Sequence, residues 1–153
     1  MLSKLAPALI FGALLMVPFA LTAHVGATGV VKERMDLMEV QKNAMRVLGA
    51  MAKGKAPFDA PKAAAAAEEI EVTATEITGL FPEGSLKHPS EATAEIWTQW
   101  DKFTADADTL EKAAAALKAA LEGDAAEWQG KFKQVIDACK TCHKTFRKED
   151  KKT

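Results

Sequence analysis

This sequence of 153 residues contains only two cysteines, Cys139 and Cys142, and has almost no excess of charge of either sign. Lys and Arg total 20 and Asp and Glu total 21, so no bulk positive charge is available for non-specific binding to nucleic acid. No segment shows the alternating pattern of a β-strand. Hydrophobic residues make up 48% and charged residues 27%, which excludes both a disordered tail and a fully membrane-embedded protein.

The N-terminus has the pattern of a secretory signal peptide. Lys4 precedes a long apolar run, and small residues follow it at Ala23 and Ala27. The alternative is an uncleaved membrane anchor, but the run is slightly shorter than the roughly 20 residues that cross a bilayer and it contains two prolines. We therefore expect a signal peptide over residues 1–23, with cleavage as late as 27, followed by one periplasmic domain over 24–153 that has no stable membrane insertion.

Four segments repeat their apolar residues with the period of an α-helix. They extend over about 30–53, 59–78 and 90–121, and from Asp124 to beyond Phe146. In the fourth segment, Asp124 and a glutamate three residues later have the spacing of a capping box. The connections are short, so consecutive helices should be antiparallel neighbours. The predicted fold is all-α, an antiparallel up-down-up-down four-helix bundle.

The apolar stripes predict which side chains face the core of the bundle. On the first two helices these are Val31, Met35, Met38, Met45, Leu48, Ala52, Ala63, Ala66, Ile70, Thr73 and Ile77. On the last two they are Ile96, Trp100, Phe103, Ala107, Leu110, Ala114, Leu117, Leu121, Trp128, Phe132, Val135, Cys139, Cys142 and Phe146. The third and fourth stripes alternate spacings of four and three residues, which is the pattern of a heptad seam.

The two cysteines and His143 form the sequence Cys-x-x-Cys-His, which is the attachment signal for a c-type haem. Residues three apart on a helix lie on one face, so Cys139 and Cys142 can both react with the vinyl groups on one edge of a haem. His143 can then reach the iron. Covalent attachment outside the cytosol also agrees with the predicted export. We therefore expect one haem c, tethered by the two cysteines and ligated by His143.

Other interpretations of the two cysteines are weaker. A disulfide within one helical turn would be strained, and a thioredoxin-like pair requires a βαβ context that this chain lacks. A zinc site could combine Cys139, Cys142 and His143 with His88 or His24. However, adjacent Cys142 and His143 cannot both easily face one tetrahedral ion.

The residue opposite His143 determines what the iron does. Methionine gives a six-coordinate iron suited to electron transfer, whereas an apolar non-ligand leaves the iron open to small gases. Counting the helical rise from the ends of the first and fourth helices favours Met38, and Met35 second. The alternative is that both are ordinary core methionines. Arg34 lies one turn before Met38, where it could pair with a haem propionate or remain a solvated helix charge.

The bundle with Cys-x-x-Cys-His near its C-terminus resembles the class II c-type cytochromes, the cytochrome c prime family. The similarity includes Arg34 to Met38, residues 52–59, Ile96-Trp97 and the segment from Cys139 to Arg147. Leu37-Met38, Asn43 to Gly54 and Leu80-Phe81-Pro82 are similar to its low-spin branch, in which a methionine of the first helix ligates iron. The resemblance implies that Met38 is the sixth ligand and His143 the fifth.

These observations predict a periplasmic single-haem electron carrier and not an enzyme. One alternative is a five-coordinate cytochrome c prime that binds nitric oxide or carbon monoxide, and another is a zinc-stabilised helical module. The expected partners are redox proteins of unknown identity, which the basic residues at the C-terminal end could attract. The resemblance also implies a possible homodimer through the first two helices.

Overall fold

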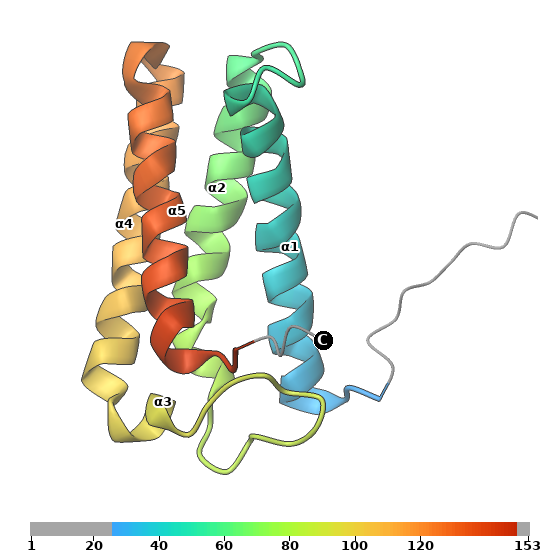
Figure 1. Cartoon of the computed structure of the whole chain (residues 1–153). Helices are drawn as coiled ribbons and strands as arrows, with labels where there is room; N and C mark the ends of the chain where they lie inside the picture. The colour runs from blue at the N-terminus through green and yellow to red at the C-terminus, as the bar shows by residue number, and fades with distance from the viewer. Residues whose placement is uncertain (1–25, 150–153) are drawn as a thin grey trace, which may run out of the picture.

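The computed structural model describes residues 26–149, so the predicted signal peptide over 1–23 lies outside the described residues. Four long helices run antiparallel to their neighbours (Figure 1). They are α1 Gly29–Ala52, α2 Ala60–Glu76, α4 Trp100–Glu122 and α5 Trp128–Phe146. The short elements are η1 Thr78–Leu80, α3 Glu95–Thr98 and η2 Ala125–Glu127. The predicted all-α four-helix bundle is confirmed.

Three of the four neighbouring helix pairs pack closely: α1 with α2, α2 with α4, and α4 with α5. Alanines make the central contact possible, because Ala63, Ala67 and Ala114 are fully buried and let α2 and α4 approach each other. α1 and α5 face the same side of the bundle in Figure 1 but do not pack closely against each other. The bundle is therefore tight on one side and open on the other.

The buried face of α1 differs from the predicted stripe. Arg34, Leu37, Gln41 and Ala44 are buried, whereas most of the predicted methionine positions are only half-buried. Gln41 is accommodated because its Nε2 donates to Thr73 Oγ1 of α2 at 3.1 Å. The predicted stripe is therefore rotated about the axis of α1 relative to the buried face. The expectation that Met35, Met38, Met45 and Ala52 lie in the core was wrong, and these residues lie on the flank of α1 beside the core.

The third helix begins later than the sequence predicted. In place of a helix from Ser90, the chain forms an isolated bridge between Ala92 and Arg147. Thr93 N donates to Phe146 O at 3.0 Å, so the backbone amide pairs with the end of α5 in place of a helical carbonyl. The helix also breaks at Gln99, between α3 and α4. Trp100 is consequently 38% exposed, and its predicted place in the core was wrong.

The start of the fourth helix is also less regular than predicted. The Asp124 carboxylate accepts from Ala126 N at 3.0 Å and caps the turn η2, so the predicted capping box with Glu127 does not form. The other predicted caps and stripes agree better, because Asp59 accepts from Lys62 N at 3.0 Å and the predicted core of α4 from Phe103 onward is buried. Among the described residues, no helix has both the length and the hydropathy to cross a membrane.

The packing of α2 against α4 predicts at which positions shortening a side chain lowers the free energy of unfolding. Leu117 is fully buried, so Leu117→Ala should lower the free energy of unfolding by about 2–5 kcal/mol, measured by denaturant unfolding. Val72, on the outer face of α2, is 52% exposed, and Val72→Ala should change it by less than about 0.5 kcal/mol. Equal losses from the two substitutions would contradict this packing.

Candidate haem site

The two thiols lie on the inner side of α5, three residues apart. Both are free and half-buried against the core. Burial raises the pKa of both thiols, and the negative charge of Asp106 adds to the effect of burial at Cys142, whose pKa rises to about 11. Both cysteines are therefore neutral thiols at pH 7. They sit on one face of the helix, as attachment to one edge of a haem requires.

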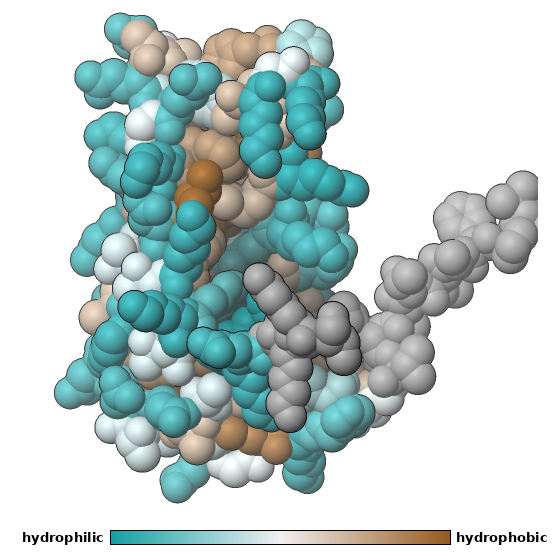
Figure 2. Space-filling model, viewed as in Figure 1, coloured by the Kyte–Doolittle hydropathy of each residue, from teal (hydrophilic) through white to brown (hydrophobic). Residues whose placement is uncertain are grey.

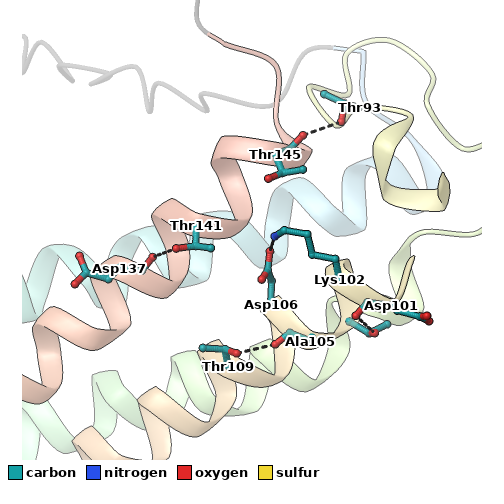
Figure 3. A network of polar contacts seen from close by, with 10 residues as sticks. Thr93, Asp101, Lys102, Ala105, Asp106, Thr109, Asp137, Thr141 and Thr145 are labelled. Carbon is teal, nitrogen blue, oxygen red and sulfur yellow. Dashed lines mark hydrogen bonds and ion pairs between the residues drawn. The ribbon is translucent and has the colours of Figure 1, made fainter. Parts of the chain in front are cut away.

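An ion pair on α4 faces the turn of α5 that carries the cysteines (Figure 3). Lys102 Nζ lies 2.6 Å from Asp106 Oδ2, and the Asp106 side chain is only 15% exposed. The same ammonium lies 5.2 Å from the centre of the Phe146 ring. Lys102 and Asp106 act in opposite directions on the pKa of Cys142, with the aspartate the stronger. The sequence did not indicate this pair, because only the packing of α4 on α5 brings it to the cysteines.

His143 follows Cys142 in the last turn of α5, and the residue as a whole is exposed. Protein atoms on its inner side and the nearby Arg147 lower its pKa, so the imidazole is neutral near pH 7. A neutral imidazole has the free nitrogen lone pair that metal ligation requires. His143 is therefore suited to bind iron.

The open side of the bundle forms a groove between α5 and α1 (Figure 2). Apolar surface lines the groove between hydrophilic rims. Met38 and Met45 of α1 and Ile136 of α5 are half-buried at the edge of the core, as the two cysteines are. Met35 is also half-buried. An apolar groove with two thiols, an imidazole and thioether sulfurs nearby fits the donor set of a c-type haem.

Arg34 points to the loop after α2. Its Nη1 donates to Ser85 O at 3.2 Å, and its other nitrogens donate to Leu80 O and Ser85 Oγ. Its guanidinium carbon lies 4.1 Å above the Phe81 ring. The side chain is 5% exposed, and burial lowers its pKa. The solvated alternative is therefore wrong, and the predicted contact with a haem propionate stays a prediction.

Aromatic rings close the end of the bundle near Arg34. Phe103 makes edge contacts with Phe81 and Phe146, with ring centres 4.9 and 5.2 Å apart. Trp97 Nε1 donates to Phe81 O at 3.0 Å. Phe81 belongs to none of the predicted apolar stripes, so its role was missed, although Leu80-Phe81-Pro82 is part of the family resemblance.

Together, the bundle and the Cys-x-x-Cys-His turn define a c-type cytochrome. The family model described as Cytochrome C′ matches residues 29–147, and the chain belongs to this family. It is 36% identical over 124 residues to cytochrome c-554 of Cereibacter sphaeroides, covering 78% of this chain and 81% of the relative. It is 34% identical over 146 residues to cytochrome c-556 of Agrobacterium fabrum, covering 95% of each.

Solved structures agree with the fold. Cytochrome c prime from Shewanella frigidimarina has a TM-score of 0.74 at 28% identity, with 78% of this chain and 94% of that chain covered. A nitric oxide complex of a mutant cytochrome c prime from Alcaligenes xylosoxidans has a TM-score of 0.72 at 25% identity, with 79% and 94% covered.

Membership of the family establishes the cofactor. Cytochromes c′ bind one haem c through Cys-x-x-Cys-His, and Cys139 and Cys142 are present here. Proteins of this family are generally non-enzymatic haem proteins. Within residues 26–149, no group of three or more His, Cys, Asp and Glu side chains could hold a metal ion. The alternative of a zinc-stabilised module is set aside, because the chain belongs to a family of haem proteins.

The raised thiol pKa values predict slow alkylation of the chain before haem attachment. Because only the thiolate reacts, Cys142 with a pKa of about 11 should react with iodoacetamide at pH 8 on the order of a hundred times more slowly than an exposed cysteine. Asp106→Asn removes the neighbouring negative charge, lowers this pKa and should speed the reaction. Asp108→Asn, on the same helix, is the control. Mass spectrometry follows each thiol, and equal rates in both variants would contradict the assignment.

The Arg34 contacts predict that this residue fixes the loop over residues 80–85. Arg34→Met should lower the free energy of unfolding by about 1–3 kcal/mol, because hydrogen bonds from a charged group are lost. It should also speed amide exchange in the loop, read by hydrogen-exchange mass spectrometry. Lys32→Met is the control, because it removes only the exposed pair with Asp36 and should cost less than about 1 kcal/mol. Unchanged exchange in the loop would show that Arg34 does not hold it.

Proposed function

We propose that this protein is a periplasmic single-haem electron carrier in which His143 and Met38 would both ligate the haem iron. The observation that carries the proposal is the open groove, which has the cysteine turn of α5 on one side and the half-buried methionine flank of α1 on the other. When bound, the haem iron changes between its ferrous and ferric states by one electron. No substrate is transformed in this role.

Several side chains of α1 and α5 would together hold the haem. Cys139 and Cys142 would form the two thioether bonds by adding their S–H groups to the haem vinyl groups, and the imidazole of His143 would supply a nitrogen ligand. Ile136 and Met45, half-buried at the edge of the core, exclude water from the groove. A fixed pair of ligands and an apolar surrounding keep the geometry similar in both oxidation states, which favours fast electron transfer.

The choice between Met38 and Met35 rests on how far each side chain is buried more than on its position along the bundle axis. α5 ends at Phe146, earlier than the sequence indicated, so His143 lies within one turn of its end. By helical rise, Met38 lies roughly 14 Å and Met35 roughly 9 Å from the start of α1, so level alone favours Met35. Met38, however, packs against the core at the groove, whereas Met35 lies further out on the helix flank. The resemblance of Leu37-Met38 to the low-spin branch of the family supports the same choice.

A second function is supported by one comparison. The similar cytochrome c prime from Alcaligenes xylosoxidans was solved as a nitric oxide complex. If Met38 stays a packing residue here, the iron keeps one open position and binds nitric oxide or carbon monoxide. The two functions differ in whether the sixth position is filled by this chain.

Met38→Ala tests the proposal on the holoprotein. We expect the ferric wild type to give a low-spin absorption spectrum with a sulfur-to-iron charge-transfer band, because a thioether is bound. The variant should lose that band, become high-spin and bind carbon monoxide readily in the ferrous state.

Met35→Ala is the matched control, because it truncates a methionine on the same flank of α1. It should leave the low-spin spectrum unchanged. Loss of the band in Met35→Ala alone would transfer ligation to Met35. A high-spin wild type that binds carbon monoxide would favour the gas-binding function.

A further inference from the structure

Charge is separated across the bundle although the whole chain has a net charge of only −1. α1 and α5, on the open side, together contain eight Lys and Arg and four Asp and Glu. α2 and α4, on the packed side, contain four Lys and Arg and nine Asp and Glu. The molecule therefore has a positive side, which is the side of α1 and α5 (Figure 1) and of the groove between them (Figure 2).

The positive residues that border the groove form what we call the basic face: Lys42 and Arg46 of α1, and Lys133, Lys140 and Lys144 of α5. All five side chains are exposed. Lys42 is four residues after Met38 and three before Met45, so it lies on the methionine flank of α1. Lys140 is next to Cys139 in sequence, and Lys144 is next to His143. Lys140 and Lys144 therefore lie beside the haem site, and Lys42, Arg46 and Lys133 lie further along the groove.

Part of this charge is not held in ion pairs. Lys42 Nζ lies 2.6 Å from Glu39 Oε2, and Lys133 pairs with Asp137. Lys140 and Lys144, in contrast, form no ion pair with any carboxylate of the residues that the structure describes. They are exposed and lie beside the turn that holds the haem. A negative surface that approached them would gain attraction without breaking an existing pair.

We propose that the basic face is the docking surface for an acidic redox partner protein. The proposal rests on the proposed function as an electron carrier and adds the chemistry of the partner. Electron transfer requires the partner to approach the haem closely, and the basic face lies along both rims of the groove that would hold it. Its charge orients an acidic partner before contact and raises the rate of productive encounters.

The near-zero net charge makes this proposal sharply testable. If only total charge mattered, a weakly negative protein would react slightly more slowly with an anion than with a cation. If the basic face directs association, the reverse holds. At low ionic strength, the rate of a reagent that reacts at the patch depends mainly on the charge of the patch. Added salt screens that charge, with a screening length of about 10 Å at 0.1 M.

The experiment measures oxidation of the ferrous holoprotein by two small reagents of opposite charge. Each ferrous protein gives one electron to hexacyanoferrate(III), which becomes hexacyanoferrate(II), or to the tris(phenanthroline)cobalt(III) cation, which becomes cobalt(II). We expect the rate with the anion to fall as salt is added and the rate with the cation to rise. The double variant Lys140→Glu/Lys144→Glu should slow the anion reaction at low salt by about tenfold or more and reverse both salt dependences.

The matched control is Lys62→Glu/Lys112→Glu, which changes the total charge by the same amount on the packed side of the bundle. Both lysines are exposed, and this variant should keep the wild-type salt dependence. An anion rate that rises with salt in the wild type, or equal effects of the two double variants, would overturn the proposal.

A binding measurement separates this proposal from the proposed function. Poly-L-glutamate added to the ¹⁵N-labelled holoprotein should shift the amide signals of α5 and α1 and leave those of α2 unchanged, whichever residue ligates the iron. A high-spin spectrum would therefore contradict Met38 ligation and leave the docking surface intact. Absence of these shifts, with binding to anionic phosphatidylglycerol vesicles that the Lys140→Glu/Lys144→Glu variant loses, would assign the face to a membrane and overturn the proposal.

Discussion

The separation between α1 and α5 is the constraint on which the rest of this structure depends. Three helix pairs pack closely, and the alanines of α2 and α4 draw the central pair together. The fourth pair stays apart, and on the facing flanks α1 presents thioether side chains and α5 presents Ile136 and the cysteine turn. Close packing of these two faces would bury the thiols and His143 against protein atoms and leave no room for a haem.

The same separation organises the electrostatics. The half-buried thiols stay neutral because burial raises their pKa values, with Asp106 adding to the effect at Cys142. The imidazole of His143 stays neutral because burial of its inner side and the charge of Arg147 oppose protonation. Hydrophilic residues line the rims of the groove, and apolar surface lies between them (Figure 2). One arrangement thus provides neutral ligand groups for iron and a charged exterior for association.

The sequence predicted the features that depend on local spacing. Cys-x-x-Cys-His is contained in five residues of one helix, so its geometry follows from helical repeat alone, and the stripe of α4 from Phe103 to Leu121 was predicted for the same reason. The failures came from contacts between distant segments. Ser90 to Ala94 read as the start of a helix, but Thr93 pairs with Phe146. The phase of α1 was wrong because Arg34 and Gln41 are polar, and their buried partners, the 80–85 loop and Thr73, lie far along the chain.

The loop contacts of Arg34 use only part of its hydrogen-bonding capacity. A guanidinium has five N–H donors, and three of the hydrogen bonds of Arg34 go to Leu80 and Ser85. Two N–H donors therefore remain that these loop contacts do not use. Because the loop contacts and the Phe81 ring already fix the side chain, a haem propionate that met these donors would lose little side-chain entropy on binding. The loop contact thus does not compete with the predicted propionate contact and would preorganise the arginine for it.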